Sequence, residues 1–103
     1  MKYVYPAIFR EDKETADTWL IEFPDLEGVF TQGDDLFDAI YMAEDVLGCS
    51  LMWAEDDGEK IPEPTPIKQI KVEPDEYSSD YFVVLIKADT DAYRLLSAEW
   101  SLL

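Results

Sequence analysis

The stretch "EFPDLEGVFTQGDDLFDAI", residues 22–40, constrains the fold most, because it leaves room for two short strands and a helix start in direct succession. Pro24 cannot donate to a strand ladder, so it ends the first strand. Gly28 supplies the permissive backbone of a tight turn. Residues 29–32 then predict a second short strand, which Gly33 ends. The stretch therefore predicts a compact strand–turn–strand unit that leads straight into a helix.

A long amphipathic helix is predicted next. Asp34 or Asp35 is expected to cap it, since a short carboxylate accepts hydrogen bonds from the free amides of the first turn. The helix is predicted over residues 35–56, with Gly58 as its left-handed terminator. Apolar residues at helical spacing are expected to form the face that packs on the sheet: Leu36, Ile40, Ala43, Leu47, Leu51 and Ala54.

Two alternating segments precede this unit and predict an antiparallel hairpin with one covered face. Residues 2–10 alternate, and so do residues 18–23, with a charged loop at 11–17 between them. Pro6 places an edge or an irregularity in the first strand. The expected core side chains of the two strands are Tyr3, Tyr5, Ala7 and Phe9, then Trp19, Ile21 and Phe23.

The chain after the helix predicts a connector and a returning strand. Residues 59–69 contain three closely spaced prolines and predict an extended, stiff connector. Residues 67–72 are a candidate edge strand. The apolar run at 81–87 is typical of a strand covered on both faces, and the rest of the chain leaves room for one short helix at most. The predicted fold class is α+β: an antiparallel three-stranded meander, one long helix packed on it, and a returning strand.

The composition indicates one folded domain with a strongly acidic surface. The chain has 103 residues, 48% of them hydrophobic, and a formal net charge of −16 from 24 acids and 8 bases. Nucleic acid binding is disfavoured, because phosphate contacts need Lys and Arg. The charge favours a basic partner, and its alternative role is solubility alone. Cys49, the single cysteine, suits a reducing cytoplasm, and no membrane span is expected.

The residue types of common catalytic sites are scarce in this sequence. The chain has no histidine, which excludes His-based triads and His-containing metal sites. Asp12, Asp17, Asp25 and Asp34 fall at strand ends or in loops, where a metal-dependent nuclease would need several carboxylates to converge. Acids are so abundant that solvated surface is the competing interpretation. We expect no catalytic residue, no metal and no cofactor.

One acidic cluster lies at the end of the predicted helix. Glu55, Asp56 and Asp57, followed by Glu59, stand where the helix dipole disfavours negative charge. A patch that faces a partner would explain this placement, so these four residues are the predicted partner-binding site. The alternative is a solvated helix end without a partner.

A series of motifs resembles the HicB antitoxin family of bacterial toxin–antitoxin pairs. The motifs are "YPAIF" (5–9), "FPDLEG" (23–28), "TQGD" (31–34), "DAIYMAEDVL" (38–47), "IPEPTP" (61–66) and "VVLIKADTDAYR" (83–94). The resemblance covers nearly the whole chain, to about residue 94. It implies structural roles for the motif residues Tyr5, Pro6, Phe23, Pro24, Asp25, Leu26, Gly28, Thr31, Gly33 and Asp34.

The resemblance implies a partly degenerate ribonuclease-H-like fold without nuclease activity. It also implies a partner, a small basic mRNA-cleaving toxin of the HicA type, whose active surface the antitoxin blocks. The alternatives are a stand-alone regulatory or binding module without a toxin and a metal-dependent nuclease.

The resemblance also suggests a division of the chain. The HicB-like antitoxin domain is expected over residues 1–94. The tail at 95–103 stands where many family members continue into a DNA-binding domain, so DNA binding is not expected for this chain. The apolar tail residues are expected to dock on the core or on a second copy, which would give a homodimer or higher oligomer: Leu95, Leu96, Trp100, Leu102 and Leu103.

Overall fold

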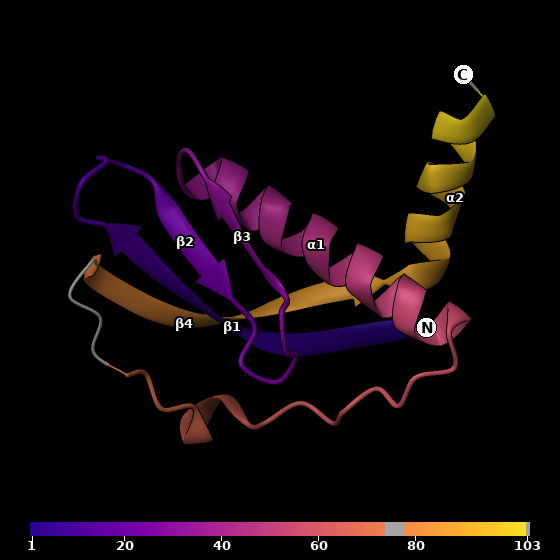
Figure 1. The fold of residues 1–103 in the computed structure, drawn as a ribbon, viewed down its shortest axis with the longest axis horizontal. Helices are drawn as coiled ribbons and strands as arrows, with labels where there is room; N and C mark the ends of the chain where they lie inside the picture. The colour runs from indigo at the N-terminus through magenta and orange to yellow at the C-terminus, as the bar shows by residue number, and fades with distance from the viewer. Residues whose placement is uncertain (74–77, 103) are drawn as a thin grey trace.

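The computed structural model describes residues 1–73 and 78–102. In this part of the chain, four strands form one antiparallel sheet in the order β3-β2-β1-β4, accompanied by two α-helices (Figure 1). This arrangement confirms the predicted α+β class with its meander, long helix and returning strand. The elements are β1 (Lys2–Asp12), β2 (Trp19–Glu22), β3 (Phe30–Gly33), α1 (Leu36–Asp56), the 3-10 helix η1 (Ile67–Gln69), β4 (Ser78–Asp89) and α2 (Thr90–Leu102).

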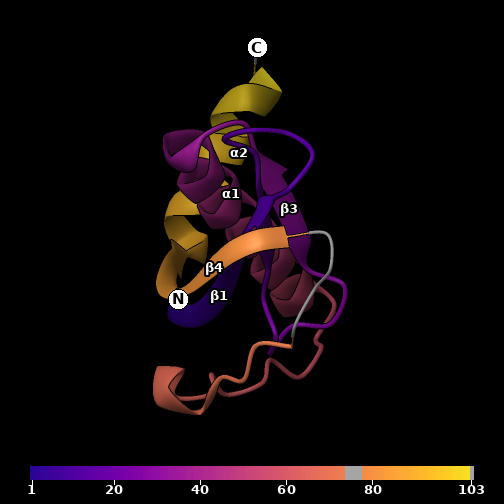
Figure 2. The same ribbon diagram turned by 90° about the vertical axis from the view of Figure 1, so that its left-hand side faces the viewer.

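β1 is the central scaffold of the sheet. It pairs with β2 over residues 8–11 and with β4 along its whole length. α1 lies on one face of the sheet, and the connector at 57–73 runs along the opposite face (Figure 1, Figure 2). The connector explains why Pro6 and Ile8, which alternate away from α1, are buried.

Two hydrogen bonds fix the direction in which each strand turns its backbone groups. The Asp12 amide donates to the Thr18 carbonyl, and the Thr90 amide donates to the Met1 carbonyl, each at 2.9 Å. Because an antiparallel ladder alternates, even-numbered residues of β1 face β2 and odd-numbered ones face β4. Even-numbered residues of β4 likewise face β1. The odd-numbered residues of β4 therefore turn their amides and carbonyls toward its free side.

Pro6 fits this pattern without the loss of a ladder hydrogen bond. Its missing N–H would point toward β2, and the β1–β2 ladder at 8–11 ends before Pro6 is reached. The prediction that β1 is an edge strand is wrong, because β1 lies between β2 and β4; only its β2 side is unpaired at Pro6. The register irregularity of β1 lies elsewhere, between Glu11 and Asp12.

The core lies between the sheet and α1, but the helix does not use the predicted face throughout. Leu36 and Ile40 are exposed, so the prediction that they face the sheet is wrong. Ala39 takes their place because β3 comes very close: a Cβ on Gly33 would lie 2.4 Å from the Ala39 nitrogen and Cα. The buried core is Tyr5, Ala7, Phe9, Ile21, Phe23, Ala39, Ala43, Leu47, Leu51 and Ile86.

Two predictions for the second half of the chain are also wrong. Residues 67–72 do not form a strand; residues 67–69 form η1, in which the Gln69 amide donates to the Pro66 carbonyl at 2.8 Å. The run at 81–87 is not covered on both faces, because β4 is an edge strand whose Tyr81 and Leu85 are 54% and 52% exposed.

α2 follows β4 without a loop, and it is the one short helix expected for the tail. Asp89 supplies its cap by accepting hydrogen bonds from the amides of Asp91 (3.1 Å) and Ala92 (3.4 Å). The predicted boundary at residue 94 lies inside this helix. Leu95 and Leu96 are exposed and so do not dock on the core. The side chains of Trp100, Leu102 and Leu103 lie outside the described residues.

Candidate partner-binding surface

The predicted acidic cluster lies where α1, β1 and α2 meet. The Glu55 carboxylate accepts hydrogen bonds from the hydroxyl groups of Tyr3 (2.6 Å) and Thr90 (3.0 Å). Arg94 of α2 forms ion pairs with Glu55 at 3.1 Å and with Asp56 at 2.8 Å. Glu55 therefore ties α2 and β1 to the last turn of α1.

These contacts set the protonation states of the junction. The hydrogen bond from Tyr3, helped by Arg94 and Thr90, holds the pKa of Glu55 below its ordinary value. Burial and the neighbouring Glu55 carboxylate raise the pKa of Tyr3 to about 12. The proton therefore stays on Tyr3 and the negative charge on Glu55, as this hydrogen bond requires.

The other members of the predicted cluster are more open to solvent. Asp57 and Glu59 are exposed, and their backbone amides close the end of α1 by donating to the carbonyls of Trp53 and Ala54, each at 2.9 Å. Asp56 is exposed but paired with Arg94. The structure thus divides the four acids, with Glu55 engaged inside the chain and the rest at its surface. A joint role in partner binding stays a prediction.

The motifs "YPAIF" and "FPDLEG" hold the proline-rich connector in place. The Asp25 carboxylate accepts hydrogen bonds from both the amide (2.9 Å) and the hydroxyl of Thr65, and the Tyr5 hydroxyl donates to the Pro62 carbonyl. Burial raises the pKa of Tyr5 above its ordinary value. Gly28 completes the turn with φ +77°. Of the remaining motif residues here, Phe23 is buried, Leu26 packs on the core and Pro24 is exposed.

The motif "TQGD" forms the junction between β3 and α1. Asp35 is the N-cap, and its carboxylate accepts a hydrogen bond from the Asp38 amide at 2.7 Å. In return, the Asp38 carboxylate accepts one from the Asp34 amide at 2.9 Å. Thr31 is half-buried on β3, and Gly33 is buried against α1. These contacts give the motif a role in joining strand to helix.

Charge is distributed unevenly over the elements. Residues 14–59, which include β2, β3 and α1, contain 14 of the 24 acids and none of the 8 Lys and Arg residues. The bases lie in β1 and its following loop, the connector, β4 and α2. The side of the molecule built by α1 and its neighbouring strands is therefore the most acidic part of the chain. Long-range attraction would bring a basic partner to this side first.

An apolar surface lies within this acidic half, at the start of α1. Phe37 and Tyr41 are 85% and 62% exposed, and Leu36 and Ile40 beside them are also exposed. We refer to these four residues as the α1 patch. Exposed acids border it on the same helix and its cap: Asp34, Asp35, Glu44 and Asp45. Aromatic centres with charged rims are typical of protein-binding surfaces.

The α1 patch was not predicted from the sequence, because the helical spacing of Leu36 and Ile40 placed them on the face toward the core. A signal was nevertheless present. Ala39 and Ala43 form a second apolar row on the helix. When a helix is apolar on two sides and only one packs on the sheet, the other stays exposed and can bind a partner.

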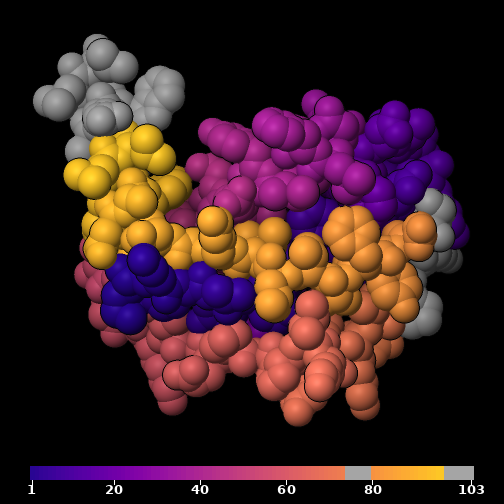
Figure 3. All heavy atoms as spheres, turned by 180° about the vertical axis from the view of Figure 1, so that it is seen from behind, coloured from indigo at the N-terminus to yellow at the C-terminus, as the bar shows by residue number. Residues whose placement is uncertain are grey.

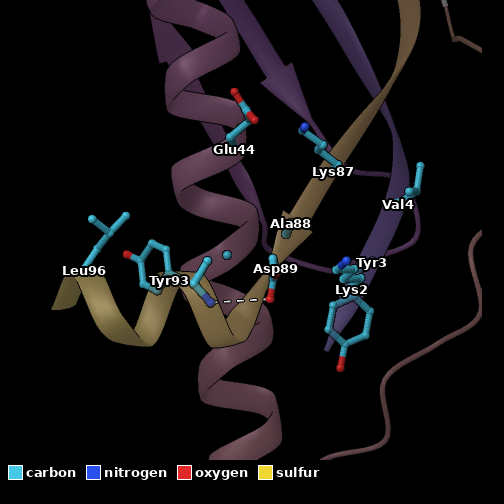
Figure 4. A pocket seen from close by; sticks show the side chains of 11 residues that line it. Lys2, Tyr3, Val4, Glu44, Lys87, Ala88, Asp89, Tyr93 and Leu96 are labelled. Atoms are coloured by element: carbon cyan, nitrogen blue, oxygen red, sulfur yellow. Dashed lines mark hydrogen bonds between the residues drawn. The ribbon is translucent and has the colours of Figure 1, made fainter. Parts of the chain in front are cut away.

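A groove of 620 Å³ separates α2 from α1 and the ends of β1 and β4 (Figure 4). Tyr93 forms one wall, packed so closely that a Cβ on Gly48 would lie 2.8 Å from its ring. Burial raises the pKa of Tyr93 to about 12. Charges of both signs line the groove, from Lys2 and Lys87 to Glu44 and Asp89. This mixture gives no preference for a ligand of one charge.

The described part of the chain shows neither a metal-binding cluster nor a membrane-spanning helix. Within residues 1–73 and 78–102, no three Cys, Asp or Glu side chains gather in a way that could hold a metal ion. Among the helices of the described chain, none is long and apolar enough to cross a membrane.

Fold, charge and exposed patch together define an acidic α+β domain with an apolar surface patch. Residues 5–98 match the family described as HicB_like antitoxin of bacterial toxin-antitoxin system. The chain belongs to this family, which confirms the family predicted from the motifs.

Solved structures share the fold. A chain of a toxin–antitoxin complex from Streptococcus pneumoniae is 24% identical, with a TM-score of 0.77 over 90% of this chain and 73% of that one. The Burkholderia pseudomallei antitoxin HicB is 19% identical, with a TM-score of 0.66 over 82% of this chain and 61% of that one. A chain of a HicA3 and HicB3 toxin–antitoxin complex is 19% identical, with a TM-score of 0.61 over 84% of this chain and 99% of that one.

A phage protein is related in sequence. A 14.9 kDa protein from the rep–hol intergenic region of Haemophilus phage HP1 (strain HP1c1) is 30% identical over 73 residues. The match covers 71% of this chain and 53% of the phage protein, so the chain spans about half the length of this relative.

Proposed function

We propose that this protein is an antitoxin that binds and neutralises a small basic toxin, an mRNA-cleaving enzyme of the HicA type. Its membership of the HicB-like antitoxin family supports this class of function. Two chains with the same fold come from toxin–antitoxin complexes, which supports a toxin as the partner.

The observation that carries the proposal is the α1 patch in the acidic half of the molecule. A toxin that cleaves mRNA needs a basic surface for phosphates. The 14 acids of residues 14–59 would compete with RNA for that surface, because they present negative charge without a cleavable bond. Phe37 and Tyr41 would supply the apolar centre that holds the complex together.

The protein acts by occlusion in this proposal and has no catalytic role. The alternative of a metal-dependent nuclease would need converging carboxylates, whereas Glu55 is taken up by Tyr3, Thr90 and Arg94. DNA binding by this chain alone is also not expected, because its 8 bases are outnumbered by 24 acids. We place its action in the cytoplasm, where an mRNA-cleaving toxin finds its substrate.

The decisive experiment is to search for a small basic protein encoded beside this chain and to titrate any such protein with it, together with rescue of growth from that protein. The double variant Phe37→Ala/Tyr41→Ala should bind at least about 30-fold more weakly, because buried aromatic anchors contribute about 2 kcal/mol or more. Phe30→Ala is the matched control. Phe30 is 72% exposed but lies on β3, outside the patch.

Each outcome separates one part of the proposal from the rest. Unchanged binding by the double variant would place the interface away from the α1 patch, whereas equal weakening by Phe30→Ala would extend the interface to β3. Absence of binding by the wild-type chain would overturn the antitoxin function and favour a stand-alone binding module.

A further inference from the structure

The two edges of the sheet are built differently. β3 has four residues, whereas β4 has twelve and pairs with β1 on one side. Within the described residues, no strand pairs with the other side of β4. The alternation of the ladder turns the backbone amides and carbonyls of residues 81, 83, 85 and 87 toward that side. Long unpaired edges bind other strands unless charge, proline or a bulge protects them.

Little of this protection is present along β4. Residues 81–88 contain one charged residue, Lys87, in a chain that is 31% charged. Tyr81 and Leu85 are about half exposed, and Phe82 is partly exposed. Figure 3 shows β4 running openly along the surface between α1 and the connector. This segment has no acids that would attract a basic toxin, and its composition fits an apolar, nearly neutral strand as a partner.

We propose that the free edge of β4 pairs antiparallel with β4 of a second copy, giving one continuous sheet through a two-fold axis at Val84. A two-fold axis perpendicular to the sheet keeps both α1 helices on the same face. It also requires that a residue near the middle of β4 lies opposite itself. Val84 is even-numbered, so its backbone groups already face β1, and the two Val84 residues form a non-hydrogen-bonded pair.

The side chains favour this centre over an axis at Val83. On the face away from α1, Lys87 comes opposite Tyr81 of the second copy, a cation–π pairing. Asp80 comes opposite Ala88, so no two acids face each other. With the axis at Val83, Asp80 would instead come opposite Ile86. On the α1 face, the register at Val84 brings Phe82, which is 37% exposed, opposite Ile86 of the other copy.

β4 leads directly into α2, which lies on the same side of the molecule as β4 (Figure 2). Leu96 of α2 lines the groove that has Lys87 on its other wall (Figure 4). A second copy along β4 would therefore lie beside the groove and beneath α2.

Salt should distinguish this contact from toxin binding. Each copy carries a formal charge of −16, so two copies repel at long range, and ions screen that repulsion. Self-association is expected to tighten as salt rises, whereas association with a basic toxin is expected to weaken.

Two measurements on the protein without a toxin test the proposal. Sedimentation should give twice the chain mass of 11.9 kDa for the wild type and the single mass for Leu85→Lys, whose new charge sits on the edge. Circular dichroism checks that this variant is folded. Oxidation of Val84→Cys in a Cys49→Ser background should give a disulfide-linked dimer, because residues in such a pair lie within reach of a disulfide. Phe30→Cys in the same background should form no disulfide-linked dimer, because Phe30 lies on β3 at the other edge of the sheet.

Several results would overturn the proposal. These are a wild-type mass of 11.9 kDa at every concentration and salt, a dimer that persists in Leu85→Lys, or a dimer in which Val84→Cys does not cross-link. None of these results bears on toxin binding, which the titration with the neighbouring basic protein tests separately.

Discussion

Arg94 of α2 and Glu55 of α1 form an ion pair between segments 39 residues apart, with 3.1 Å between Arg94 Nη2 and Glu55 Oε1. Much of α2 projects away from the body of the protein (Figure 1), so this contact and the buried Thr90 at its start hold the helix in place. A residue that composition would assign to an acidic surface is therefore part of the internal framework.

The first prediction compares two acids that are two positions apart. Glu55→Ala should lower the free energy of unfolding by about 1–3 kcal/mol, because it leaves the hydroxyl groups of Tyr3 and Thr90 without their shared acceptor. Asp57→Ala should change it by less than about 0.5 kcal/mol, since Asp57 is exposed. Urea unfolding of both variants measures the difference. Equal values would show that the Glu55 contacts contribute nothing to stability.

The second prediction concerns acid. The folded pKa of Glu55 is lowered, so its contribution to stability is present above its ordinary pKa of 4.5 and is lost as the pH falls through the folded value. The wild type should therefore exceed Glu55→Gln in unfolding free energy near neutral pH, and the two curves should converge below pH 4.5. Unfolding titrations at a series of pH values measure this. A constant gap at all pH values would contradict the prediction.

The third prediction separates a close approach from a strained backbone. Gly33→Ala should destabilise the protein by about 1–3 kcal/mol through overpacking, because its new Cβ meets backbone atoms of Ala39. Adding Ala39→Gly should bring no recovery, since the backbone atoms remain. Gly28→Ala should cost about 1–2 kcal/mol through its positive φ alone, with open space around it. Recovery of Gly33→Ala by Ala39→Gly would place the clash on the Ala39 side chain instead.

Local sequence signals predicted the parts of the fold that local chemistry determines. Pro24, Gly28 and the Asp35 cap act through their own backbone neighbourhood, so the turn, the short strand and the start of α1 could be predicted. The proline-rich connector was also predicted as extended. Its attachment through Asp25 and Thr65, which are 40 residues apart, left no local signal.

The wrong predictions concern features that depend on where each element lies in the assembled sheet. A run such as 81–87 is apolar in a central strand because both faces are covered, but here one face of β4 meets the core while Tyr81 and Leu85 remain exposed. The face of α1 depended on how closely Gly33 lets β3 approach Ala39. Neither the edge position of β4 nor the close approach of β3 to α1 can be read from periodicity alone. The same limit hid the internal role of Glu55.

The last prediction tests whether the association rate with a toxin depends on the position of the acidic residues or only on the net charge of the chain. Glu44 borders the α1 patch, and Glu63 lies on the connector across the sheet; both are exposed. Glu44→Lys and Glu63→Lys change the net charge equally, so a difference between them reports the position of the charge. If the α1 patch meets a basic toxin, Glu44→Lys should lower the association rate roughly threefold to tenfold at low salt and flatten its salt dependence. Glu63→Lys should have a much smaller effect.

Stopped-flow association at salt concentrations from about 0.01 to 0.5 M measures both rates, because the screening length falls from about 30 Å to only a few ångströms over this range. The dissociation rate should change little in either variant, since it depends on the apolar centre at Phe37 and Tyr41. Equal slowing by the two substitutions would mean that total charge alone attracts the toxin. A larger effect of Glu63→Lys would move the interface to the connector face of the sheet.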